Sequence, residues 1–311
     1  MASQLRSPIK RGEQVQTSDG DFNKLGGDQF VKVNGQLTTL GTFTNYKSGT
    51  IALDYDQVNP AEVYLTNKGK FNSPGDIALF GSVVNDGHMY ISGQFEIYTL
   101  NTTFTNSNNA TLEFNTYADD LELSDVTNLG SIAIAKQSAG VLFYGYIGGE
   151  GSTLTLDGPA ATITGTEANA INNGQLISGI SVNTFIDNFA NGSTGVIEAY
   201  GIFTILKNGL TNSGQLINKS SSTLTVIDES LLQNKGSGSI TNLGKIVNDG
   251  TIDIREGSYT GNAVDNDGGK GRVIGKGTLS GSGTIVGDFD NDAIVSPGNS
   301  AGGHRFEGDF N

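Results

Sequence analysis

The sequence predicts an all-β chain that folds as a single right-handed parallel β-helix (β-solenoid) of about 13 coils. Three observations lead to this prediction: a phrase that recurs along the chain, strand-like alternation within each repeat, and a composition rich in turn-forming residues. Gly accounts for 45 of the 311 residues, whereas Pro contributes only 5, and Cys and Trp are absent. Because Gly adopts backbone conformations that other residues avoid, such a composition is typical of a chain with many tight turns.

The recurring phrase reads apolar, polar, Asn, any residue, Gly, any residue, apolar. It occurs at 65–71 (LTNKGKF), 83–89 (VVNDGHM), 126–132 (VTNLGSI), 210–216 (LTNSGQL), 240–246 (ITNLGKI) and 246–252 (IVNDGTI). Its Asn residues and those of looser copies include Asn45, Asn67, Asn85, Asn106, Asn128, Asn172, Asn191, Asn212, Asn234 and Asn266. Most successive intervals lie near 21 residues, which is the length of one solenoid turn. We therefore predict a structural role for these residues, in turns and in ladders of stacked, hydrogen-bonded amides.

Alternation with a period of two identifies the elements within a repeat. Clear examples are 49–53 (GTIAL), 152–156 (STLTL), 223–227 (TLTVI) and 250–254 (GTIDI). Apolar residues that alternate with Thr or Ser are the signature of a half-buried strand, and hardly any window has the spacing of an amphipathic helix. We expect three short strands in each repeat, with the apolar side chains pointing inward.

The chain is expected to have two parts, a polar leader or N-terminal cap at 1–30 and the solenoid at 31–311. The leader contains Arg6, Lys10 and Arg11 but no apolar core of a secretory signal. No stretch approaches the roughly 18 apolar residues of a membrane-spanning helix, so no transmembrane segment is predicted. The basic leader faces an acidic body, which makes another copy of the chain one candidate for its partner.

Acidic residues dominate the middle of the chain. The net charge is −14. Between Phe71 and Leu206 there are thirteen Asp and Glu residues but only one basic residue, Lys136. Nucleic acids and anionic membranes bind clusters of Lys and Arg, so neither is an expected partner. An acidic surface keeps a long β structure soluble, and it also attracts divalent cations or basic partners.

Few residues suit a metal ion or another cofactor. Without Cys there is no thiolate ligand, and the two His residues, His88 and His304, are far apart in the sequence. The alternating Asp288, Asp290 and Asp292 in GDFDNDA are weak candidates for Ca²⁺ ligands, although a solvated acidic turn is the ordinary interpretation. No other cofactor is expected.

Catalysis is the less favoured alternative, in the form of a carbohydrate-active β-helix enzyme such as a polysaccharide lyase, a hydrolase or a tailspike-like protein. A lyase that acts on uronic acids requires a basic residue beside the substrate carboxylate, and the central repeats offer only Lys136. A hydrolase requires two carboxylates about 5–10 Å apart, for which Glu113 with Asp119 or Asp120 is one example. Any acidic solenoid offers such pairs, and we predict that the chain is not an enzyme.

The C-terminal stretch 275–310 reads GKGTLSGSGTIVGDFDNDAIVSPGNSAGGHRFEGDF. It resembles the repeat that closes the β-helical passenger regions of bacterial autotransporters and haemagglutinin-like adhesins. The matching residues are Gly277, Gly281, Gly283, Ile285, Pro297, Gly298, Asn299, Ser300, Gly302, Phe306, Gly308, Asp309 and Phe310. The resemblance implies a β-helix with a surface or extracellular location, and it supplies no catalytic residues.

Together these observations predict a non-enzymatic, extracellular or cell-surface β-solenoid protein with a structural or adhesive role. Its expected partner is either a second copy of the chain, through end-to-end or lateral assembly into filaments, or a surface glycan or protein. Adhesion predicts an exposed aromatic patch around Phe143, Tyr144 and Tyr146. Assembly predicts filaments that are lost when residues 1–30 are deleted.

Overall fold

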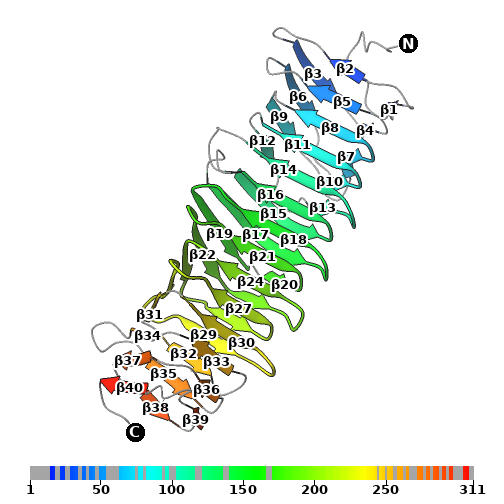
Figure 1. The fold of residues 1–311 in the computed structure, drawn as a ribbon. Helices are drawn as coiled ribbons and strands as arrows, with labels where there is room; N and C mark the ends of the chain where they lie inside the picture. The colour runs from blue at the N-terminus through cyan, green and yellow to red at the C-terminus, as the bar shows by residue number, and fades with distance from the viewer. Residues whose placement is uncertain are drawn as a thin grey trace. The chain divides into compact units, whose positions relative to one another are not determined.

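The computed structural model describes residues 103–115, 121–135, 140–165 and 170–243 without a gap, and mainly the strands in 15–97 and 245–307. The chain divides into two compact units, Met1–Pro159 and Ala160–Asn311. All regular elements of the described residues are β-strands, and within each unit they stack as successive turns of a parallel β-solenoid (Figure 1). The predicted fold class is therefore confirmed, whereas its handedness stays a prediction.

In the first unit, strands of successive turns stack on three faces. One face contains β2 (Phe22–Lys24), β5 (Thr42–Asn45), β8 (Lys70–Ser73), β11 (His88–Ile91), β14 (Thr111–Phe114), β16 (Ser131–Ile134) and β18 (Thr153–Leu156). The second contains β1 (Val15–Thr17), β4 (Leu37–Thr39), β7 (Val63–Asn67), β10 (Ser82–Asn85), β13 (Phe104–Asn106), β15 (Leu121–Asn128) and β17 (Val141–Gly148). The third contains β3 (Gln29–Val33), β6 (Gly49–Leu53), β9 (Asp76–Leu79) and β12 (Phe95–Ile97). β1 and β2 lie within the predicted leader 1–30, whose boundary stays a prediction.

The second unit also has three strands in most turns. One face contains β21 (Gln175–Ser178), β24 (Val196–Ala199), β27 (Gln215–Asn218), β30 (Ser239–Asn242), β33 (Ser258–Gly261), β36 (Thr278–Ser280) and β39 (Ile294–Ser296). A second stack contains β20 (Ala170–Asn172), β23 (Phe189–Asn191), β26 (Leu210–Asn212), β29 (Leu231–Asn234), β32 (Thr251–Ile254), β35 (Arg272–Gly275) and β38 (Phe289–Asn291). A third contains β19 (Ala160–Thr164), β22 (Asn183–Asp187), β25 (Ile202–Ile205), β28 (Thr223–Val226), β31 (Lys245–Asn248), β34 (Val264–Asp265), β37 (Gly283–Val286) and β40 (His304–Glu307).

The number of turns differs from the prediction. Either unit stacks about seven turns, so the two units together have about 14, whereas the sequence led us to expect about 13 coils in one continuous stack. The prediction divided the chain length by a constant period, and this calculation cannot detect the division at residue 159.

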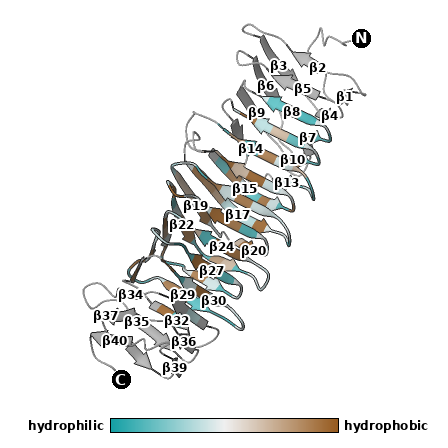
Figure 2. Cartoon of the chain, viewed as in Figure 1, coloured by the Kyte–Doolittle hydropathy of each residue, from teal (hydrophilic) through white to brown (hydrophobic). Residues whose placement is uncertain are grey.

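Columns of apolar side chains form the core of each unit. On the β8–β18 face, the register places Phe71, Met89, Leu112, Ile132 and Leu154 above one another, and all five are buried. The same alternation of apolar and polar residues runs through the described strands in Figure 2. Burial of one such side chain contributes about 1.5–3 kcal/mol, so the apolar columns supply the main driving force for stacking.

Candidate functional site

The repeated asparagines of the first unit form a continuous ladder inside the solenoid. Asn67 Nδ2 donates a hydrogen bond to Asn85 Oδ1 at 2.8 Å, and Asn85 donates in the same way to Asn106 at 2.8 Å. Asn106 then donates to Asn128 at 2.9 Å. All four side chains are buried. The donor of each amide thus lies one turn before its acceptor.

The remaining amide atoms bind the backbone. Asn85 Nδ2 also donates to the carbonyl oxygen of Thr111 at 2.9 Å, and Asn128 Nδ2 to that of Thr153 at 2.9 Å. Asn85 Oδ1 accepts a further bond from the N–H of Gly87 at 3.3 Å, two residues along the chain. Asn85 therefore uses both donors and both acceptor positions of its amide, which is the condition for burying it without a large penalty.

The glycine of the phrase is required by the close stacking of turns. A Cβ atom on Gly87 would lie 2.2 Å from the carbonyl oxygen of Gly69, and one on Gly130 would lie 2.3 Å from that of Ala110. Both distances are far shorter than any van der Waals contact. The pairing of Asn with Gly in the phrase thus has two causes. The Gly N–H donates a hydrogen bond to the Asn side chain, and the stacked turns leave no space for a side chain at the Gly.

The second unit contains a corresponding ladder. Asn172 Nδ2 donates to Asn191 Oδ1 at 2.9 Å, Asn191 to Asn212 at 2.8 Å, and Asn212 to Asn234 at 2.8 Å. Asn172 Oδ1 is buried without a hydrogen-bond partner, so this amide begins its ladder with one unused acceptor.

A second ladder in this unit and the two tyrosines that follow ladder amides were not predicted from the sequence. Asn218 donates to Asn242 at 2.8 Å, and Asn242 Nδ2 donates to the hydroxyl oxygen of Tyr259 at 3.1 Å. In the first unit, Asn128 Nδ2 donates to the hydroxyl oxygen of Tyr146 at 3.2 Å. In both units a hydroxyl therefore takes the acceptor position of the next amide.

Both tyrosines share a sequence pattern. Gly148 stands in register with Asn128 and Gly261 with Asn242, so glycine replaces the next asparagine. A Tyr two residues earlier supplies the missing acceptor. Tyr-x-Gly in place of apolar-x-Asn is the signal that could have revealed these positions.

Burial sets the protonation of these tyrosines. Desolvation raises the pKa of Tyr146 to about 12, although hydrogen bonds from Asn128 and Ser152 lower it in part. Desolvation likewise raises the pKa of Tyr259 well above its usual range, against a lowering by Asn242. Both hydroxyls are therefore uncharged at neutral pH.

Other predicted positions fall outside the described residues or side chains. This group includes the side chain of Asn45, the residue Asn266 and the Ca²⁺ candidates Asp288, Asp290 and Asp292. The cation site therefore stays a prediction. Among the residues that the structure describes, no group of three or more His, Asp or Glu residues could hold a metal ion.

The predicted aromatic patch is wrong at two of its three residues. Phe143 and Tyr146 are fully buried and pack edge to face with ring centroids 5.8 Å apart, whereas Tyr144 is 36% exposed. The cause is Gly145, whose φ of +79° interrupts the alternation of β17 and turns the residue after it inward. The sequence led us to expect all three aromatic residues in one exposed patch.

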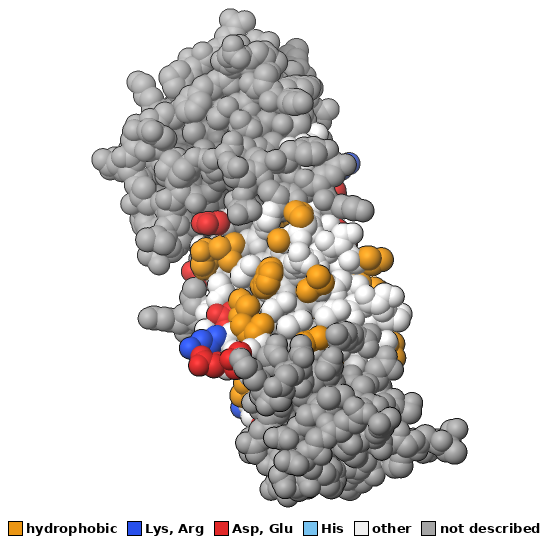
Figure 3. All heavy atoms as spheres, turned by 90° about the vertical axis from the view of Figure 1, so that its left-hand side faces the viewer, with side chains coloured by type: hydrophobic (Ala, Val, Ile, Leu, Met, Phe, Trp, Pro, Cys, Tyr) orange, Lys and Arg blue, Asp and Glu red, His pale blue; other side chains and the backbone are white. Residues whose placement is uncertain are grey.

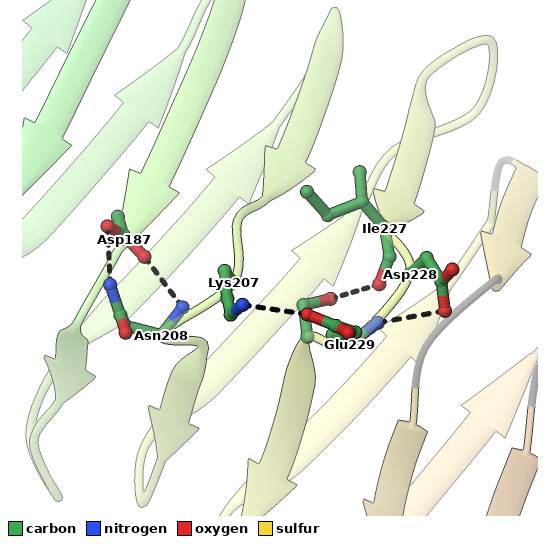
Figure 4. Close-up of polar contacts among 7 residues, drawn as sticks. Asp187, Lys207, Asn208, Ile227, Asp228 and Glu229 are labelled. Atoms are coloured by element: carbon green, nitrogen blue, oxygen red, sulfur yellow. Dashed lines mark hydrogen bonds and ion pairs between the residues drawn. The ribbon is translucent and has the colours of Figure 1, made fainter.

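Polar side chains also connect turns on the outside. In the second unit, Asp187 accepts two hydrogen bonds from Asn208, one from its backbone N–H at 2.8 Å and one from its side chain at 2.9 Å (Figure 4). Lys207 Nζ lies 2.7 Å from Glu229 Oε2, with both side chains about 70% exposed. Exposed ion pairs of this kind contribute at most about 1 kcal/mol, so they orient the turns without dominating stability.

A more sheltered ion pair lies on the β21–β33 face. Lys219 Nζ is 2.5 Å from Glu198 Oε1, and Gln175 donates to the other carboxylate oxygen at 3.1 Å. The hydrogen bond to Glu198 raises the pKa of Lys219. Lys219 also lies 5.3 Å from the ring centroid of Tyr200. Both Glu198 carboxylate oxygens and the Lys219 ammonium group have partners within this cluster, which indicates a structural role.

The β8–β16 part of the first unit has a concave outer surface. Glu113, one member of the predicted carboxylate pair, lies there and is exposed, whereas Asp119 and Asp120 are outside the described residues. His88 is also exposed, and its Nδ1 lies 2.7 Å from Thr111 Oγ1. This surface therefore combines ionisable and hydroxyl groups that the ladders do not use.

Comparisons with protein-family models, with curated proteins and with solved structures each find no match to this chain. In the part of the chain that the structure describes, no helix has the length and apolar character needed to cross a membrane.

Proposed function

We propose that this chain is a non-enzymatic structural or adhesive protein that works outside the cell or at its surface. The observation that carries the proposal is the saturation of the ladder amides, in which the most frequently repeated polar residue forms fixed internal hydrogen bonds. Residues used in this way give rigidity to the scaffold. Binding is then the task of the outer faces, as in other repeat proteins with extended surfaces.

The outer surface supports the same proposal. One outer face has hydrophobic side chains in separate small groups among uncharged polar side chains, with charged residues beside them (Figure 3). The exposed apolar residues include Tyr144 and Ile147 in the first unit and Ile180 and Ile202 in the second. The resemblance of 275–310 to adhesin repeats agrees with a role in which such surfaces meet other molecules.

Surface labelling tests the proposal. Antibodies against the purified chain are applied to intact producing cells, before and after treatment with external protease, with a cytoplasmic protein as control. We expect labelling of intact cells that protease removes while the cytoplasmic control is untouched. Labelling that requires permeabilised cells would contradict the proposed location, and turnover of a polysaccharide by the purified chain would contradict the non-enzymatic role.

A further inference from the structure

The outer surface of β8, β11, β14 and β16 contains a concavity of about 480 Å³ within the first unit. Its side chains come from four successive turns. They include Lys70, Asn72, His88, Tyr90, Thr111 and Glu113. We call this concavity the outer groove.

Strand register explains the shape of the groove. Tyr90, Glu113 and Ala133 occupy one outward column, and His88, Thr111 and Ser131 occupy the neighbouring one. The outward residues of β16, Ser131 and Ala133, are small, whereas His88, Tyr90 and Glu113 in the two preceding turns are larger. The surface is therefore low over β16 and is bounded by the larger side chains of the preceding turns.

The groove offers one fixed aromatic side chain. Tyr90 is half-buried, and its hydroxyl oxygen accepts a hydrogen bond from Asn115 Nδ2 at 3.0 Å. This hydrogen bond holds the ring in place, so the groove presents a preformed aromatic surface to a ligand.

Around the ring lie both donors and acceptors. The exposed Glu113 carboxylate has no ion-pair partner among the described residues, and the ammonium group of Lys70 lies two turns away from it on the same face. Thr111 engages one ring nitrogen of His88, which leaves the other nitrogen for a ligand. An apolar ring together with alternating donors and acceptors matches a pyranose, whose C–H face is apolar and whose rim is a ring of hydroxyls.

We propose that the outer groove binds a neutral hexopyranose unit of a glycan, with Tyr90 against the sugar ring and Glu113 accepting hydrogen bonds from its hydroxyls. This inference names a ligand for the adhesive role proposed above and rests on it. A polyanion is disfavoured as ligand because the chain carries a net charge of −14.

Saturation-transfer NMR with the purified full chain tests the proposal. The probes are the methyl glycosides of glucose and galactose and N-acetylglucosamine, each at millimolar concentration. We expect transfer to the ring protons of at least one probe. In Tyr90→Leu and in Glu113→Gln the dissociation constant should increase by about tenfold or more, and circular dichroism should show the wild-type fold.

A matched control in the same unit is Glu150→Gln, which alters an exposed carboxylate away from the groove and should leave binding unchanged. The proposal is overturned when no probe shows transfer, or when Tyr90→Leu and Glu113→Gln bind as tightly as the wild type. Its failure is separate from that of the proposed function: a chain that labels on intact cells but binds no probe refutes the groove alone. A chain that binds a probe but labels only inside cells refutes the proposed location alone.

Discussion

An asparagine in the interior of a ladder, such as Asn85, is bonded to the turns before and after it, so a single substitution affects three turns. Asn85→Leu keeps the side-chain size but removes the acceptor of Asn67 and the donor to Asn106. The two neighbouring ladder amides each lose a partner, which costs about 1–3 kcal/mol each, and the Thr111 carbonyl and the Gly87 N–H also lose a hydrogen bond. We expect the free energy of unfolding in urea to decrease by about 3–5 kcal/mol.

The matched control is Asn108→Leu, because Asn108 is exposed in the turn that follows the same ladder. That variant should unfold within about 0.5 kcal/mol of the wild type. Equal stability of Asn85→Leu and wild type would show that the amide ladder does not stabilise the solenoid.

Tyr146 should make the chain sensitive to alkali. Its folded-state pKa is about 12, against an ordinary value of 10.0, so the folded chain retains a proton that the unfolded chain loses. Stability from this group is complete below pH 10 and is lost as the pH rises toward 12, by about 1.4 kcal/mol per pH unit. Urea unfolding at a series of pH values measures the slope.

In Tyr146→Phe this additional slope should disappear, whereas Tyr144→Phe should keep it because Tyr144 is partly exposed. The Phe variant should also be less stable at neutral pH by about 1–3 kcal/mol, since one hydrogen of Asn128 Nδ2 loses its acceptor. Identical slopes in Tyr146→Phe and wild type would be evidence that this hydroxyl is not buried as described.

At the scale of elements, the turn that contains Gly87 packs closely against the turn before it, which leaves no space for a side chain. Gly87→Ala places a methyl group 2.2 Å from the carbonyl oxygen of Gly69, and neither backbone can retreat without breaking strand pairing. We expect a loss of stability on the order of 3 kcal/mol, measured by thermal or urea unfolding.

Gly151→Asn is the comparison, since Gly151 has a φ of +77° and no atom within 4 Å of the added Cβ. Asn tolerates this backbone conformation, so the cost should be at most about 1 kcal/mol. If both variants lose the same stability, crowding between turns is not the reason for glycine in the repeated phrase.

The strands themselves were largely predictable, because alternation with a period of two is a property of neighbouring residues. β18 and β28 show the alternation and burial that the sequence indicated. β17 departs from it at Gly145, where a positive φ reverses the direction of the following side chains. Such a change of direction depends on the backbone of the adjacent turn, about 20 residues away. It therefore cannot be predicted from the neighbouring residues in the sequence.

At the scale of the whole molecule, net charge and backbone pairing at the ends of a stack would act in opposite directions on self-assembly. A charge of −14 repels other copies, whereas unpaired backbone groups at the end of a parallel stack attract them. We expect the mass measured by light scattering to increase with protein concentration, and to increase more at high salt, where the repulsion is screened.

Deletion of residues 1–30 provides the comparison for the predicted assembly, and electron microscopy of the same samples shows whether the larger species are filaments. A constant monomer mass over the concentration series, at low and high salt alike, would contradict self-assembly. The adhesive part of the proposal would be unaffected.

The sequence by itself determined the repeat, the strand type and the asparagines of the first-described ladder in each unit, because each of these is a short-range pattern of residue types. Only the tertiary structure decided which amide donates to which, where Tyr146 and Tyr259 take the acceptor role, and which aromatic residues are buried. It also decided the division into two units and the outer groove. The physical reason is that these features depend on the register between turns, and register is set by side-chain volume and backbone corners in residues about 20 positions apart.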